Sequence, residues 1–91
     1  MIRVAVVISG CGHLDGAEIS ETVFTLLELD RNNVETGIFA PNQKQHYVIN
    51  HLTKKEVVEE RNVLVESARI ARGAIQSLNE LIKINFDGYA I

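Results

Sequence analysis

Residues able to do chemistry gather near the start of the chain, in a short glycine-rich loop at residues 9–12. Cys11, the only cysteine, lies there between Gly10 and Gly12, and an acidic segment follows from Asp15. A loop of this kind between an apolar strand and a helix leaves backbone N–H groups unpaired, and the helix dipole favours negative charge beside them. The pattern therefore favours a site for a thiolate, an anion or a developing oxyanion.

Three interpretations of Cys11 stay open. It is a nucleophile whose thiolate the helix N-terminus stabilises, a residue lining the pocket of another nucleophile, or a small side chain in a tight turn. His13 lies two residues away on the same loop and could act as its base. Adjacency in sequence rarely gives a cysteine and a histidine the geometry that such a pair needs.

The loop also imitates a dinucleotide-binding fingerprint, because Gly10 and Gly12 are followed by Gly16. That function needs an acidic residue at the end of the second strand to hold the ribose. The second strand ends at residues 37–41 without a carboxylate. An anion or oxyanion site on the same amides fits better, and we expect no cofactor.

The histidines and arginines carry weaker signals. His13, His46 and His51 are scattered without the spacing of metal ligands, so no metal site is expected. We expect His51 to tie a loop to backbone carbonyls, and a cleft-facing role is the alternative.

Three arginines, Arg61, Arg69 and Arg72, predict a solvated basic stripe in which Glu66 pairs with Arg69. In the alternative, Arg61 holds an anionic substrate or a partner subunit.

The elements that must position these residues begin with a β-branched run at residues 2–8, typical of a parallel strand covered on both faces. Asp15 and Glu18 have the spacing of a capping box for a following helix, whose apolar positions are Ile19, Val23, Leu26 and Leu27. Asn32 and Asn33 end that helix, and residues 34–40 predict a second strand. Together these elements predict a right-handed βαβ unit.

The second half of the chain is less regular. Residues 41–45 predict a polar loop and residues 46–50 a short extended piece. A helix is expected from about residue 59 or 60 to Arg72, with Leu64, Ala68 and Ala71 inward and Gly73 closing it. A capping-box spacing at Ser77 and Glu80 precedes a short helical turn, and residues 86–91 predict a third strand.

Length and composition bound the function classes. The 91 residues suit one small domain, and a net charge of -3 gives no footprint for nucleic acid or an anionic membrane. No apolar run approaches the roughly 20 residues needed to span a bilayer. A lone cysteine and a strand starting at residue 2 or 3 lead us to expect a cytoplasmic protein. Because the chain stops inside an apparent core strand, we expect part of a larger α/β domain; a domain completed by oligomerisation is the alternative.

Several stretches, spread in order along the chain, resemble the ElbB family of isoprenoid-biosynthesis glyoxalase-like proteins. They are residues 7–12, 15–19, 39–41, 48–53, 61–64 and 68–73. The resemblance implies the PfpI and class I glutamine-amidotransferase-like superfamily, and with it an α/β flavodoxin-like three-layer sandwich with a parallel sheet. Residues 1–91 would be the N-terminal part of a single such domain.

The resemblance also implies where the chemistry lies. The principal nucleophilic cysteine would follow residue 91, on a strand-to-helix elbow. In the superfamily a glutamate of the first helix sits beside that cysteine as its proton partner, and its setting matches Glu21, followed by Thr22 and Val23. Taken alone, the residues favour a solvated first-turn acid that complements the helix dipole, worth ~0.3–1 kcal/mol. With the resemblance, Glu21 is the catalytic candidate, and the pocket candidates are Gly10, Cys11, Gly12 and Glu18.

The implied activity is that of a cofactor-free glyoxalase-like lyase, which converts small 2-oxoaldehydes to 2-hydroxy acids with cysteine and glutamate. The expected partners are an aldehyde substrate and a second copy in a homodimer, without nucleic acid or membrane. Activity is expected of the full-length protein and not of residues 1–91 alone. A sensor or binding module, or an amidase or deglycase, remains an alternative, because a fold does not fix chemistry.

Overall fold

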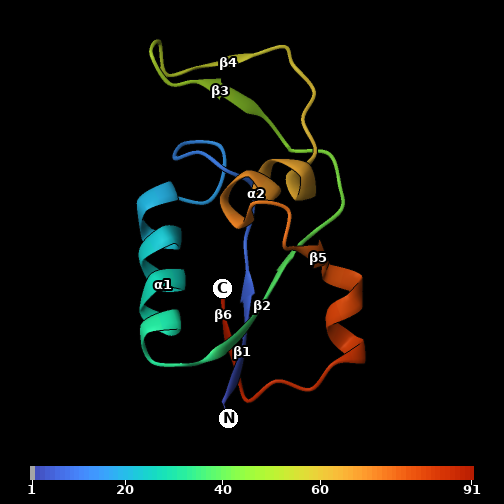
Figure 1. Cartoon of the computed structure of the whole chain (residues 1–91). Helices are drawn as coiled ribbons and strands as arrows, with labels where there is room; N and C mark the ends of the chain where they lie inside the picture. Colours follow the sequence, from blue (N-terminus) through green and yellow to red (C-terminus); the bar gives the residue numbers. More distant parts are fainter. Residues whose placement is uncertain (1) are drawn as a thin grey trace.

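A four-stranded parallel sheet forms the centre of the molecule in the computed structural model, which describes residues 2–91 (Figure 1). Its strand order is β5-β2-β1-β6, and every neighbouring pair runs parallel. The strands are β1 (Arg3–Val7), β2 (Glu35–Ala40), β5 (Gln76–Ser77) and β6 (Gly88–Ala90). The α/β class with a parallel sheet is therefore confirmed, although the sequence predicted three strands and missed the two-residue β5.

Helix α1 (Ile19–Arg31) joins β1 to β2, and it ends at Asn32 as the sequence predicted. The predicted capping box is wrong. Glu18 is itself the N-cap, because its Oε2 accepts a hydrogen bond from the Glu21 amide at 2.7 Å. The Asp15 carboxylate instead accepts from the Ile49 amide at 2.7 Å, which removes it from the helix end.

The core lies where β1 and β2 pair, in a register that sets Val7 beside Phe39. Phe39 is 1% exposed, and Ala5, Val6, Ile8 and Ala40 are buried around it. The Phe86 ring meets the Phe39 ring edge-on, with centroids 5.7 Å apart. Gly37 makes room for this contact, since a Cβ there would lie 2.8 Å from the Phe86 ring.

A two-stranded antiparallel hairpin leaves the body of the molecule between β2 and the next helix (Figure 1, top). It consists of β3 (Val48–Asn50) and β4 (Lys55–Val57), paired with Val48 opposite Val57. The sequence predicted the extended piece at β3 but not β4. Lys55 and Glu56 are exposed, so β4 carries no apolar alternation by which a strand could be recognised.

Helix α2 (Val63–Ala71) begins later than predicted, because the Asn62 side chain caps it by accepting from the Val65 amide at 2.9 Å. It packs against β2 and touches α1. The predicted inward face is confirmed only at Ala71. Leu64 and Ala68 are only half-buried, whereas the buried positions are Val63, Glu66, Ser67 and Ala71. The helix closes with Arg72 in the left-handed region and Gly73 at φ +86°, as its glycine predicted.

The last helical segment, η1 (Leu78–Lys83), is a 3-10 helix, and Figure 1 shows it on the side of the strands opposite α1. Ser77 precedes it without a side-chain cap, so the second predicted capping box is also wrong. Strand β6 is shorter than the predicted 86–91. Within residues 2–91, no helix combines the length and apolar character that crossing a bilayer requires.

Candidate functional site

In the structure the glycine-rich loop extends from Ser9 to Ala17, with residues 13–15 at its tip. It folds tightly against α2 and against itself. Gly10 adopts φ +86°, and its amide donates a 2.8 Å hydrogen bond to the hydroxyl of Ser67, which is fully buried. Gly16 packs onto the start of the loop so closely that a Cβ there would lie 2.9 Å from the Cys11 amide nitrogen. The glycines thus serve a close approach of backbone to backbone.

The base of the loop is closed by two backbone hydrogen bonds. The Ala17 amide donates to the Ser9 carbonyl at 2.9 Å, and the Gly12 amide donates to the Ala17 carbonyl at 3.1 Å. These amides, like that of Gly10, already have protein acceptors. The sequence pattern had suggested that these amides bind an anion. They are not free to do so, because each already donates to a protein acceptor.

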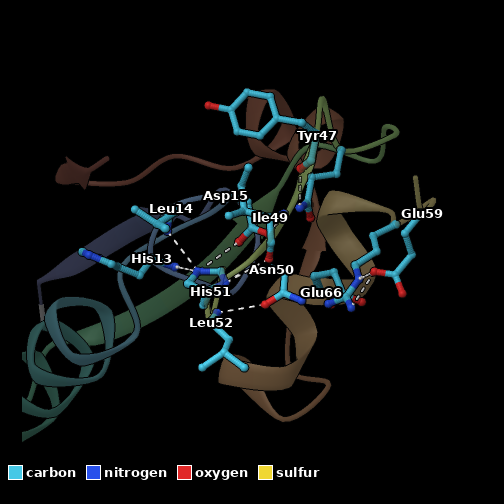
Figure 2. Close-up of polar contacts among 12 residues, drawn as sticks. His13, Leu14, Asp15, Tyr47, Ile49, Asn50, His51, Leu52, Glu59 and Glu66 are labelled. Carbon is cyan, nitrogen blue, oxygen red and sulfur yellow. Dashed lines mark hydrogen bonds and ion pairs between the residues drawn. The ribbon is translucent and has the colours of Figure 1, made fainter. Parts of the chain in front are cut away.

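The tip of the loop is held by His51 (Figure 2). Its Nε2 accepts from the amides of His13 at 3.3 Å and Leu14 at 3.2 Å, and its Nδ1 lies 3.0 Å from the Ile49 carbonyl. The predicted tie between His51 and a backbone carbonyl is confirmed, and the two amide contacts add to it. Because Nε2 accepts, the proton of the neutral ring belongs on Nδ1.

A cavity of about 350 Å³ lies between the carboxyl ends of β1 and β6 and the first turns of α1. This is the edge at which open α/β sheets bind ligands. Glu18 and Glu21 both line it. The other lining residues are Val6, Val7, Ile8, Ser9, Ala17, Thr22, Thr25, Pro41, Ala90 and Ile91.

The structure thus brings two of the predicted site residues, Glu18 and Glu21, to one cavity. The other three, Gly10, Cys11 and Gly12, are absent from its described lining. Cys11 is half-buried in the loop, and Gly12 beside it is buried. A role for Cys11 next to the chemistry stays a prediction.

A second cavity, of about 510 Å³, shares Ser9 and Ala17 with the first. Its wall also includes Asp15, Gln45 and Tyr47. The base of the glycine-rich loop is therefore a common wall of both cavities.

Arg61 is held by two carboxylates, at 2.8 Å from Glu59 and 3.3 Å from Glu66. Hydrogen bonding to Glu59 and the charges of both acids raise the pKa of Arg61 above its ordinary value. Arg69 approaches Glu66 at 3.4 Å, which confirms the predicted pair. The sequence placed Glu66 in a solvated stripe, yet Glu66 is only 7% exposed. These contacts give Arg61 a structural role.

Among the described residues no group of three or more histidines, cysteines or acids could hold a metal ion.

No protein-family model matches the chain. Among curated proteins, it is 53% identical over 87 residues to the ES1 protein homolog, mitochondrial, of Rattus norvegicus. It is 52% identical over 87 residues to the glutamine amidotransferase-like class 1 domain-containing protein 3, mitochondrial, of Homo sapiens. The ES1 protein, mitochondrial, of Danio rerio is 39% identical over 89 residues. These matches cover 93–96% of the chain, but the chain spans only about a third (32–33%) of the relatives' length.

A solved structure is also similar to this chain, both in sequence and in fold. It is an isoprenoid biosynthesis protein with an amidotransferase-like domain from Ehrlichia chaffeensis, 48% identical to this chain, with a TM-score of 0.89. The match covers 98% of this chain and 42% of that one. The flavodoxin-like fold is thereby confirmed.

The expected cytoplasmic location is contradicted, because the three curated relatives are all named mitochondrial. The position of the first strand and the lone cysteine were poor guides, since neither distinguishes the cytoplasm from another compartment that keeps thiols reduced. The relatives do not single out the ElbB family. Sequence and fold together support the glutamine amidotransferase-like superfamily for this chain.

Proposed function

We propose that the cavity between β1, β6 and α1 is the reaction site of a cofactor-free, glyoxalase-like lyase, in which Glu21 transfers the proton. The proposal concerns the whole protein, because the chain spans about a third of its curated relatives. The observation that carries it is the position of Glu21. This residue lines the cavity from the first turn of α1, at the sheet edge where such folds bind ligands.

Each step of this chemistry balances without a metal or a redox cofactor. A cysteine thiolate adds to the aldehyde carbon of a 2-oxoaldehyde and gives a thiohemiacetal. The Glu21 carboxylate removes the proton on that carbon, and the electron pair forms an enediolate. Glu21 returns the proton to the neighbouring carbon, and the hydroxyl proton moves from the former aldehyde oxygen to the oxygen of that carbon, which gives a 2-hydroxy thioester. Water then hydrolyses the thioester to the 2-hydroxy acid and the free thiol.

This proposal takes its cysteine from the remainder of a protein as long as the curated relatives, of which the chain spans about a third. Ala90 and Ile91 line the same cavity as Glu21. In a longer protein, the residues after Ile91 would continue from this point. Cys11 would then be a neighbour of the reacting thiol.

Glu21 is a better proton carrier than Glu18 because Glu18 already has a structural task. Its carboxylate accepts from the Glu21 amide and so caps α1. The Glu21 side chain is exposed and borders the cavity.

The test is the turnover of methylglyoxal by the full-length protein, comparing wild type with Glu21→Gln. Loss of a positioned general base typically lowers kcat about 10²–10⁴-fold, and we expect a fall in that range. Glu28→Gln is the matched control, since Glu28 lies two turns further along the same helix and pairs with Arg31 on the surface. Its rate should equal that of wild type.

Equal turnover by wild type and Glu21→Gln removes the proposed role of Glu21. A wild-type protein without turnover removes the lyase function altogether.

The name of the human relative favours a second candidate, acyl transfer from glutamine. In that reaction a cysteine attacks the side-chain amide, ammonia leaves, and water releases glutamate from the thioester. Ammonia release from glutamine by the same preparation distinguishes the two functions.

The names of the relatives also lead us to propose a mitochondrial location for this protein.

A further inference from the structure

The β3–β4 hairpin touches the glycine-rich loop through a small polar cluster, shown in Figure 2. The cluster joins Asp15 at the tip of the loop to His51 and Ile49 on the hairpin. The Asp15 side chain is 6% exposed, although it belongs to a surface loop. Its Oδ2 accepts from the Ile49 amide at 2.7 Å, which is the short distance typical of a charge-assisted hydrogen bond.

His51 completes this cluster from the other direction. Its Nε2 accepts from two successive loop amides, those of His13 and Leu14, while its Nδ1 meets the Ile49 carbonyl at 3.0 Å. The Asp15 Oδ1 lies 3.6 Å from the same Nε2, beyond hydrogen-bonding distance. One imidazole thus links the loop backbone to the backbone of β3.

The tip that these contacts hold is continuous with the wall of the cavity. The bond from the Ala17 amide to the Ser9 carbonyl closes the base of the loop, and both residues line the cavity. Gly12 forms a bridge to Glu18, the N-cap of α1. A displacement of the tip is therefore transmitted to the first turn of α1, where Glu21 lies.

From this geometry we infer that His51 is a positioning residue, and that the β3–β4 hairpin is a brace which fixes the glycine-rich loop and, through it, the cavity beside Glu21. The inference rests on the proposed function for the role of the cavity. The conformation of the loop can be measured without it.

The test uses variants of His51 in the whole protein. His51→Leu removes the acceptor, whereas the side-chain carbonyl of Gln can reach the place of Nε2 in His51→Gln. His46→Leu is the matched control, because His46 is an exposed histidine before the same strand and, among the described residues, makes no hydrogen bond or ion pair with the cluster. The first readout is hydrogen exchange of the His13 and Leu14 amides, followed by NMR.

We expect His51→Leu to speed the exchange of these two amides at least tenfold, and His51→Gln and His46→Leu to leave it within about threefold of wild type. The amides of Ala5 and Val6 in the central strand report on the fold and should stay protected in every variant. Unchanged exchange in His51→Leu overturns the inference. Equal acceleration in His51→Leu and His51→Gln does so too, because the acceptor would then not matter.

The second readout is kcat/KM for methylglyoxal, which we expect to fall at least tenfold in His51→Leu and to recover in His51→Gln. Accelerated exchange in His51→Leu with an unchanged kcat/KM shows that the loop does not position the site, and overturns the inference. A wild-type protein without turnover overturns the proposed function instead, and the exchange data then decide whether the brace exists.

Discussion

Gly16 has the closest backbone contacts in the loop, and it shows how single residues set the site. A Cβ at this position would lie 2.9 Å from the Cys11 nitrogen and 3.1 Å from the Ser9 carbonyl oxygen. Both are backbone atoms, which cannot rotate away as a side chain can. Gly16, the third glycine of the pattern that imitates a dinucleotide fingerprint, is therefore explained by close packing of the loop backbone and not by a bound nucleotide.

We expect Gly16→Ala to lower the free energy of unfolding by about 1–3 kcal/mol, because the added methyl group must displace backbone. Gly88→Ala is the control. Its nearest neighbour would be the Val4 side chain at 3.8 Å, an ordinary contact, so the change should stay within about 0.5 kcal/mol. Urea unfolding of both variants and wild type measures the difference. A Gly16→Ala protein as stable as wild type would show that the loop has room to shift.

The residues of the site could be predicted from the sequence to different degrees. Glu18 and Glu21 both line the cavity, but the local pattern alone favoured a solvated acid at the helix start, and only the family resemblance singled out Glu21. Asp15 was assigned to the wrong task, since its partner Ile49 lies 34 residues away along the chain. The amide contacts of His51 were missed for the same reason, as no local spacing relates residue 51 to residues 13 and 14.

At the scale of elements, the unit β1–α1–β2 was predicted almost to the residue because its signals are long and apolar. The end of α1 at Asn32 needed no tertiary information. Strands β4 and β5 were not found, since they have three and two residues and owe their structure to pairing partners. The start of α2 was set too early, because Asn62 is the cap and the acids before it bind Lys44 and Arg61 instead.

Asn62 offers a test of this account of α2. Its side chain accepts from the Val65 amide, and it also donates to the Asn42 side chain at 2.9 Å. Asn62→Ala should cost about 1 kcal/mol of unfolding free energy, the usual loss for an N-cap. Asn85→Ala, an exposed loop position, should change the denaturation midpoint little. Equal midpoints for the two variants would mean that the cap does not stabilise the helix.

At the scale of the whole molecule, α1 is poorly covered by the rest of the chain. None of its residues is buried, and Phe24 and Leu27 are 65% and 52% exposed. Contiguous exposed apolar patches on soluble proteins often belong to interfaces. The homodimer expected from the sequence stays a prediction.

The cavity is a property of the whole molecule, because β1, β6 and α1 each supply part of its wall. The central claim is that Glu21 moves a proton there between two carbons of the substrate. A carboxylate that removes a proton from one carbon can return the same proton to the next carbon. Deuterium from the solvent enters the product only when the proton on Glu21 exchanges before it is returned.

The most direct measurement is turnover of methylglyoxal in D₂O by the full-length protein, with the lactate analysed by NMR. We expect Glu21→Gln to form lactate at least 100-fold more slowly than wild type, and any deuterium on the carbon that bears the hydroxyl to report exchange on the carboxyl group during the transfer. Lactate formed by Glu21→Gln at the wild-type rate, with or without deuterium, would contradict the role of Glu21.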